Sequence, residues 1–128
     1  LFDNNFTLDE IRGAEIKVQV LGEDNYKLEG VSSMKEISRD PMDLVNQTIN
    51  RNHQYPDGFA LFLGTMFAPI EDRDVIGEGF THKIDDLVSI STEKLGVLEN
   101  KVKFCSDCAP WSFGVGALIK NLSVRGLC

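Results

Sequence analysis

Ala14-Glu15-Ile16-Lys17-Val18-Gln19-Val20-Leu21 is the stretch that predicts the fold most directly. Its apolar side chains alternate with polar ones, which is the period of two of a β-strand with one buried face. The residues that follow, Gly22-Glu23-Asp24-Asn25, are typical of a turn. Tyr26 and Leu28 then resume the alternation. We therefore predict a β-hairpin with one solvent-exposed face.

Helix signals flank this hairpin on both sides. Thr7 followed by Glu10 has the spacing of a capping box, so a short helical turn is expected over residues 6–12. Asp40-Pro41 opens a second helix, because Asp can cap it and Pro fits its first position. This helix should carry one apolar stripe and end before Tyr55-Pro56-Asp57-Gly58. The stripe consists of Met42, Val45 and Ile49.

The second half of the chain is predicted to add strands and a helix. The apolar run Phe59–Leu63 is expected to be a buried strand, and a charged loop should span Ile70–Gly79. Leu87–Ser91 and Val97–Phe104 are predicted to form a hairpin through the tight Glu93–Gly96 connection. The last predicted helix covers Trp111–Val124, with Leu118, Ile119 and Leu122 as its inner face and Gly126 as its stop.

Composition excludes several classes of protein. The chain has 128 residues, 42% of them hydrophobic, and a formal net charge of −7, which suits one globular domain or part of one. Its 13 basic residues are scattered among 20 acidic ones, so nucleic acid is not an expected partner. We interpret Lys101 and Lys103 as part of a solvated surface. No apolar run is long enough to span a bilayer, so no membrane partner is expected.

The amino terminus suggests a piece of a longer protein. The chain begins at Leu1 without an initiator Met, and the first residues lack the basic and apolar regions of a signal peptide. The three cysteines, Cys105, Cys108 and Cys128, do not form an even disulfide set and fit a reducing compartment. A cytoplasmic location is therefore expected. The Cys105–Cys108 spacing permits a zinc or redox site, but two loop thiols is the simpler interpretation.

The junction after Phe59–Leu63 is the strongest candidate for a binding site. Gly64 lets a ligand approach the backbone, and Thr65 offers a hydroxyl and neighbouring N–H groups to a carboxylate or oxyanion. The only histidines, His53 and His82, could each serve as a general base or simply be structural residues.

Two carboxylate pairs could hold a divalent cation but are more simply solvent-facing acids that flank turns. They are Asp72/Asp74 and Asp85/Asp86. Nucleophile-elbow, phosphate-loop and His-Glu-x-x-His motifs do not occur in the sequence.

Four segments together resemble the fumarylacetoacetate hydrolase superfamily, over about residues 1 to 126. They are Ile37-Ser38-Arg39-Asp40-Pro41, His53-Gln54-Tyr55-Pro56-Asp57-Gly58, Leu61-Phe62-Leu63-Gly64-Thr65-Met66-Phe67-Ala68-Pro69 and Gly79-Phe80-Thr81-His82-Lys83. The tail Leu95–Val102 looks like the family's closing hairpin. The branch that includes the 2-keto-3-deoxy-pentonate dehydratases is the most similar. Family members run to several hundred residues, so residues 1–128 resemble the C-terminal part of their catalytic domain.

The resemblance implies a fold and a chemistry. The fold would be α+β and β-rich, part of a mixed-sheet β roll with two main helices, and family members are commonly homodimers. The chemistry acts on 2-keto acids chelated by a divalent cation, usually Mg²⁺, with Mn²⁺ or Ca²⁺ as alternatives. The substrate-binding Gly-Thr of the family matches Gly64 and Thr65, while His53, Gln54 and Met66 are further candidates in the matched segments.

The family's metal ligands and catalytic base are expected upstream of this chain, because no Glu-x-Glu pair occurs in it. Where relatives have Gly-Asp, this chain has Asp85-Asp86. A turn that needs a positive φ would be strained by Asp85, although Asp tolerates this conformation better than most residues. The predicted reaction is dehydration of a 2-keto-3-deoxy sugar acid. The alternatives are hydrolysis of an acylpyruvate such as fumarylacetoacetate, or a non-catalytic assembly role for the isolated chain.

Overall fold

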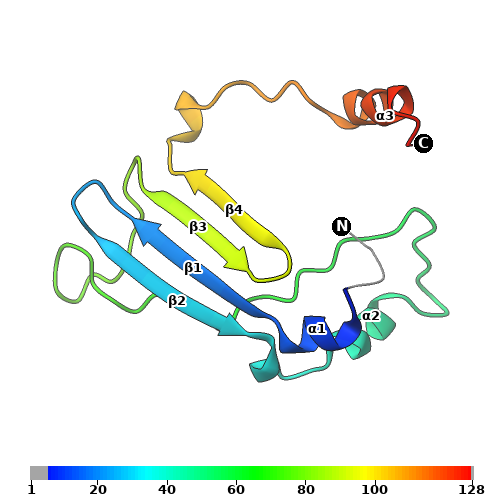
Figure 1. Cartoon of the computed structure of the whole chain (residues 1–128), viewed down its shortest axis with the longest axis horizontal. Coiled ribbons are helices and arrows are strands. Elements are labelled where there is room, and N and C mark those ends of the chain that lie inside the picture. Colours follow the sequence, from blue (N-terminus) through cyan, green and yellow to red (C-terminus); the bar gives the residue numbers. More distant parts are fainter. Residues whose placement is uncertain (1–5, 128) are drawn as a thin grey trace.

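The computed structural model describes residues 6–127 as an α+β fold around one four-stranded antiparallel sheet. The strand order is β2-β1-β3-β4 (Figure 1). The strands are β1 (Glu15–Leu21), β2 (Lys27–Ser33), β3 (Leu87–Thr92) and β4 (Gly96–Lys101). The helices are α1 (Leu8–Gly13), α2 (Pro41–Thr48) and α3 (Val115–Val124), with 3₁₀ turns η1 (Met34–Glu36) and η2 (Cys105–Asp107).

The first predicted hairpin is confirmed. β1 pairs with β2 from Glu15 opposite Ser33 to Leu21 opposite Lys27. The turn is closed by a hydrogen bond from the Gly22 N–H to the Tyr26 carbonyl at 2.9 Å.

The second predicted hairpin is also confirmed, with a shorter final strand. β3 pairs with β4 from Leu87 opposite Lys101 to Thr92 opposite Gly96. Gly96 takes a φ of +86°, a conformation that glycine adopts without strain. β4 ends at Lys101 rather than at Phe104. Beyond it, Val102 still bonds Asp85 and Asp86, the two residues before β3.

The two hairpins join along β1 and β3, which places one apolar face on the sheet. Val18 lies opposite Ile90 and Val20 opposite Val88. On the other side of β1, Val20 lies opposite Leu28. Val20 is 2% exposed and Leu28 is 3% exposed, so the core of the molecule sits on this inner face.

Local capping explains where the helices begin and end. The Thr7 hydroxyl accepts a hydrogen bond from the Glu10 N–H, and the Glu10 carboxylate accepts one from the Thr7 N–H, as the capping-box spacing predicted. Asp40 caps α2 by accepting a hydrogen bond from the Met42 N–H at 2.9 Å. Gly126, with a φ of +65°, ends α3 as predicted.

The prediction of a buried strand at residues 59–63 is wrong. This stretch forms no strand, and Phe62 is 92% exposed. It lies in the long connection between α2 and β3, with Gly58 and Gly64 in left-handed backbone conformations at its two ends. A strand needs a neighbour for its N–H and C=O groups, and the sheet is built from the two hairpins alone.

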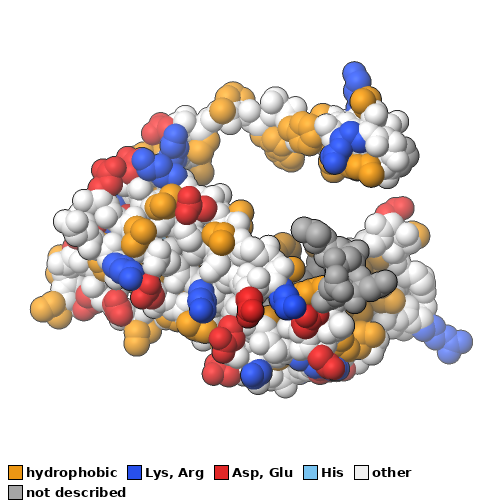
Figure 2. Space-filling view, viewed as in Figure 1, with side chains coloured by type: hydrophobic (Ala, Val, Ile, Leu, Met, Phe, Trp, Pro, Cys, Tyr) orange, Lys and Arg blue, Asp and Glu red, His pale blue; other side chains and the backbone are white. Residues whose placement is uncertain are grey.

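The C-terminal helix also differs from its prediction. It begins at Val115 rather than Trp111, and it lies at the end of an extended segment, apart from the sheet (Figure 1). The expected inner face therefore lacks the cover that was predicted, with Ile119 56% exposed. A hollow separates this segment from the sheet in the space-filling view (Figure 2).

Candidate functional site

A cavity of about 390 Å³ lies on the inner face of the sheet. Its floor is formed by apolar side chains of β1, β2 and β3, among them Val18, Leu28 and Val88. The connection between α2 and β3 supplies its walls, including Phe67 and Phe80. The cavity can therefore surround an apolar group on a ligand, while polar contacts come only from its rim.

Gly64 and Thr65 lie at this rim and are both exposed. Gly64 has a φ of +81° and open space around it, so glycine serves the backbone turn here. The Thr65 hydroxyl accepts a hydrogen bond from the Phe67 N–H at 3.1 Å and donates one to the Phe67 carbonyl at 3.2 Å. Within residues 6–127, the N–H groups of Gly64 and Thr65 have no hydrogen-bond partner.

Two contacts hold the Gly64–Thr65 turn against β2. The Met66 N–H donates a hydrogen bond to the Ser32 hydroxyl at 2.8 Å, and Ser32 is buried. The Phe67 ring lies directly over Gly30, where a Cβ atom would come well within 3.0 Å of the ring. Glycine at position 30 thus leaves the space that lets the rim residues sit on the sheet.

His82 lines the same cavity. Its ring meets the edge of Phe80 at 4.8 Å between centroids, and its Nδ1 atom is 3.6 Å from Asp86 Oδ2. A histidine beside a carboxylate can hold or pass a proton. The structure therefore brings one predicted histidine to the same cavity as Thr65.

Asp86 is the centre of a buried ion pair with Arg73. Arg73 Nη2 lies 2.7 Å from Asp86 Oδ1, and Nη1 bonds the second carboxylate oxygen. Both side chains are 1% exposed. The hydrogen bond from Arg73 lowers the pKa of the Asp86 carboxyl, and the Lys83 N–H, at 2.9 Å from Oδ2, acts in the same direction. Asp86 raises the pKa of Arg73 in turn.

Exposed charges extend this pair to the first hairpin. Arg73 Nη2 is 3.2 Å from Asp24 Oδ1, and Lys83 Nζ is 2.8 Å from Asp24 Oδ2. Lys83 also pairs with Asp74 at 2.6 Å. The Lys83 hydrogen bond is the main cause of the lowered pKa of Asp24. These contacts tie the segment that carries His82 to the β1–β2 turn.

An aromatic ring covers the guanidinium of Arg73. Its Cζ atom lies 4.5 Å from the centroid of the Tyr26 ring, a cation–π distance. Burial raises the pKa of Tyr26. The Tyr26 hydroxyl and the Arg73 Nε atom are buried without a hydrogen-bond partner in the described part of the chain.

The interpretation of Asp85 and Asp86 as solvent-facing acids is wrong for Asp86. It is correct for Asp85, which is 40% exposed and pairs with Lys101 at 2.8 Å. Asp85 has a φ of +69°, so the turn keeps a left-handed residue at a position where Asp takes the place of glycine. That turn directs the side chain of the next residue, Asp86, inward to Arg73. Two neighbouring acids therefore differ in burial.

The other candidate residues lie away from the cavity. His53 forms an isolated bridge with Asn50 and is exposed, and the Gln54 amide donates to the Arg51 carbonyl. Met66 contributes its backbone to the rim and is not part of the cavity lining. Only Gly64, Thr65 and His82 therefore share the site.

The cysteines and acids offer no metal centre in residues 6–127, where no three His, Cys, Asp or Glu side chains come together. Cys105 and Cys108 are exposed thiols at the η2 turn, and Cys128 lies outside the described residues. Asp72 accepts hydrogen bonds from the Gly77 and Gly79 N–H groups, which closes its own loop. The residues present therefore do not fit a divalent cation.

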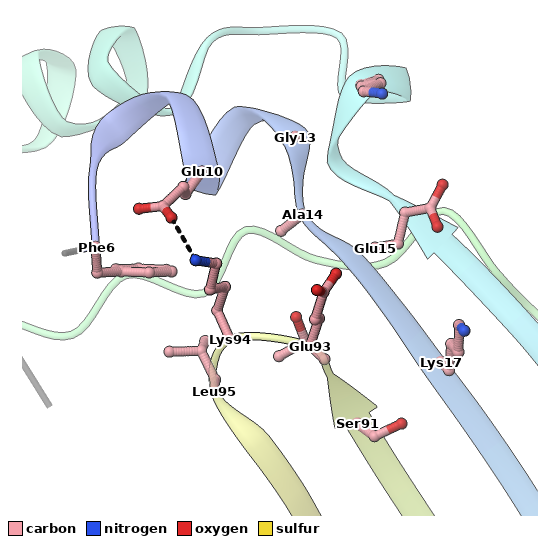
Figure 3. Close-up of a pocket in the computed structure, with 12 residues that line it drawn as sticks. Phe6, Glu10, Gly13, Ala14, Glu15, Lys17, Ser91, Glu93, Lys94 and Leu95 are labelled. Atoms are coloured by element: carbon pink, nitrogen blue, oxygen red, sulfur yellow. Dashed lines mark ion pairs between the residues drawn. The ribbon is translucent and has the colours of Figure 1, made fainter.

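A larger concavity of about 780 Å³ lies between α1 and the β3–β4 turn (Figure 3). Its lining carries both signs of charge. Glu10 and Lys94 form an ion pair across it at 3.1 Å, and both extend into it beside Phe6. The hydrogen bond from the Thr7 N–H, with Lys94 second, lowers the pKa of Glu10. Since the Glu10–Lys94 pair joins α1 to the β3–β4 turn, this surface resembles a junction between elements more than a binding site.

Comparison of the chain with models of protein families, with curated proteins and with solved structures found no match. Within the described residues, no helix is both long enough and apolar enough to cross a membrane. The candidate site is therefore identified from its geometry alone. Sequence reasoning missed Arg73 and the burial of Asp86. The one available signal was an arginine inside an otherwise acidic, glycine-containing loop.

Proposed function

We propose that this chain is the C-terminal part of a divalent-metal-dependent enzyme that acts on 2-keto acids, with Gly64 and Thr65 binding the substrate carboxylate. The observation that carries the proposal is the exposed Thr65 hydroxyl and the two unpartnered N–H groups at the rim of a ligand-sized cavity. Three donors at one turn suit an anion. The sequence resemblance to the fumarylacetoacetate hydrolase superfamily supports the same assignment, whereas the described residues form a single antiparallel sheet rather than the mixed-sheet β roll.

Thr65 can serve a carboxylate with little rearrangement. Its O–H is directed at the Phe67 carbonyl at 3.2 Å, the longer of its two bonds. When an anion arrives, the O–H turns to it, while the hydroxyl oxygen still accepts from the Phe67 N–H. A hydrogen bond to a charged acceptor contributes about 1.5–3 kcal/mol. Thr65 would therefore orient the substrate, with its chain extending over the apolar floor.

His82 lines the same cavity as Thr65. Its ring is fixed by Phe80 and by the carboxylate of Asp86. We assign it the role of a proton carrier for the bound keto acid.

Mg²⁺ supplies Lewis-acid stabilisation of an enolate in this class of chemistry. Asp86, Asp74 and Asp72 are engaged by Arg73, by Lys83 and by a backbone N–H group, respectively. The proposal assigns the metal ligands to polypeptide outside this chain. The enzyme that we propose is homodimeric and cytoplasmic.

The proposed reaction is dehydration of a 2-keto-3-deoxy sugar acid. A second candidate, hydrolysis of an acylpyruvate, is favoured by the apolar floor of the cavity. Sugar hydroxyls would find few partners there, because the residues of the floor are mainly Val, Ile and Leu.

The proposal can be tested by measuring the binding of 2-oxo acids to the chain with backbone amide NMR. We expect 2-oxobutyrate to shift the amide signals of Gly64 and Thr65, and Thr65→Val to weaken that binding about tenfold, as the loss of one such hydrogen bond predicts. Thr65→Ser keeps the hydroxyl and should bind nearly as well. Thr92→Val removes a hydroxyl from β3 and is the matched control. Unmoved Gly64 and Thr65 signals at saturating 2-oxobutyrate would remove the carboxylate site from the proposal.

A further inference from the structure

β4 is an open edge of the sheet (Figure 1). All six of its residues are exposed, with Leu98 60% exposed. Among residues 6–127, no segment pairs with its outer side. An exposed edge strand presents unpaired N–H and C=O groups that can pair with another strand.

The direction of these groups follows from the ladder. The Val102 N–H donates to the Asp86 carbonyl, and the Val102 carbonyl accepts from the Asp85 N–H, so residue 102 bonds toward β3. Bonding direction alternates along an antiparallel strand. Asn100 and Leu98 therefore also bond toward β3, and Glu99 and Lys101 direct their N–H and C=O groups to the open side.

The side chains on this edge are self-complementary. Glu99 and Lys101 lie two residues apart and so share one face of the sheet. In an antiparallel pair of identical strands related by a two-fold axis through Asn100, Glu99 of one copy lies opposite Lys101 of the other, and the reverse. The same register places Leu98 opposite Val102 of the second copy, which covers an exposed apolar side chain.

The neighbouring registers are unfavourable. A two-fold axis perpendicular to the sheet keeps each side chain on its own face. The residue that lies opposite a given position can therefore change only by two positions at a time. An axis through Glu99 places two carboxylates face to face, and an axis through Lys101 does the same with two ammonium groups. Like charges in directly opposite positions destabilise a strand pair.

We propose that β4 pairs antiparallel with β4 of a second copy of this chain, with the axis at Asn100, to form a continuous eight-stranded sheet. In this register Glu99 and Lys101 of the two copies also exchange backbone hydrogen bonds. The inference deepens the homodimer of the proposed function by naming its interface, and it uses the open edge and its charges. Its test involves no keto acid, so its failure leaves the proposed carboxylate site unaffected.

Charge reversal tests the register. Sedimentation velocity on the full chain should give a mass near twice 14.3 kDa. Glu99→Lys and Lys101→Glu each turn both cross-pairs into like-charge pairs and should weaken the dimer roughly tenfold or more. An equimolar mixture of the two variants should recover the dimer, because each heterodimer again pairs opposite charges.

Glu29→Lys is the matched control, since Glu29 lies on the same face of β2, the other edge strand. It should leave the dimer unchanged. A chain that stays monomeric at 1 mM would overturn the proposal. So would a dimer that survives both reversals, a dimer broken by Glu29→Lys, or a mixture that fails to recover.

Discussion

The ion pair between Arg73 and Asp86 makes the sharpest prediction about stability. Asp86→Asn keeps the size of the side chain and removes its charge, which leaves the guanidinium of Arg73 buried beside a neutral amide. Removal of one partner from a buried ion pair costs about 3–5 kcal/mol. We expect about 3 kcal/mol, at the low end of this range, because Asp24 is 37% exposed and still reaches Arg73.

Urea unfolding followed by circular dichroism measures this loss. With a slope of about 1.5–2 kcal/mol per molar urea, the midpoint should fall by roughly 1.5–2 M. Asp85→Asn is the matched control, because Asp85 is an exposed neighbour at a positive φ that Asn also adopts. It should change the free energy of unfolding by less than about 1 kcal/mol. A midpoint for Asp86→Asn within the error of Asp85→Asn would refute the ion-pair argument.

The same pair predicts a pH dependence with a definite sign. The pKa of Asp86 is lower in the folded chain than its ordinary value of 3.8. The stabilisation is therefore complete above about pH 4 and is lost as the pH falls through the lower, folded pKa. The difference between wild type and Asp86→Asn should shrink below pH 4, and a difference that grows in acid would contradict the assignment.

Three further predictions concern the sheet, the site and α1. Gly30→Ala should cost about 1–3 kcal/mol in urea unfolding, because its Cβ would displace the Phe67 ring, whereas Gly13→Ala, with open space around it, should cost no stability. In the full-length enzyme that we propose, Thr65→Ala should lower kcat/KM roughly tenfold to a hundredfold in steady-state assays, and unchanged kinetics would remove Thr65 from the site. Thr7→Ala should lower the free energy of unfolding by about 1 kcal/mol through the loss of its cap, and an unchanged thermal melt would argue against that role.

The contrast between residues 14–28 and residues 59–63 shows what a pattern can predict. The first stretch alternates polar and apolar residues around a turn, so its two strands pair with each other and need no distant partner. Residues 59–63 form an apolar run of similar length, but a strand there would require a neighbour from elsewhere in the chain. An apolar run carries no information about whether that neighbour exists.

The candidate site also combines local features with contacts between distant residues. Gly64 and Thr65 were predicted from their residue types, since a glycine turn beside a hydroxyl is a local arrangement. Their proximity to His82, 17 residues further on, depends on Phe67 packing over Gly30 and on Arg73 holding Asp86. Those contacts join residues that are far apart along the chain.

The amino-acid sequence alone determined the two hairpins and the helix caps, because each depends on side chains within a few positions of one another. Tertiary structure alone decided that Asp86 is buried while Asp85 is exposed, that His82 and not His53 faces the cavity, and that β4 remains an open edge. Burial and strand pairing depend on which distant segments meet, and the free energy of those contacts is absent from any local stretch of residues.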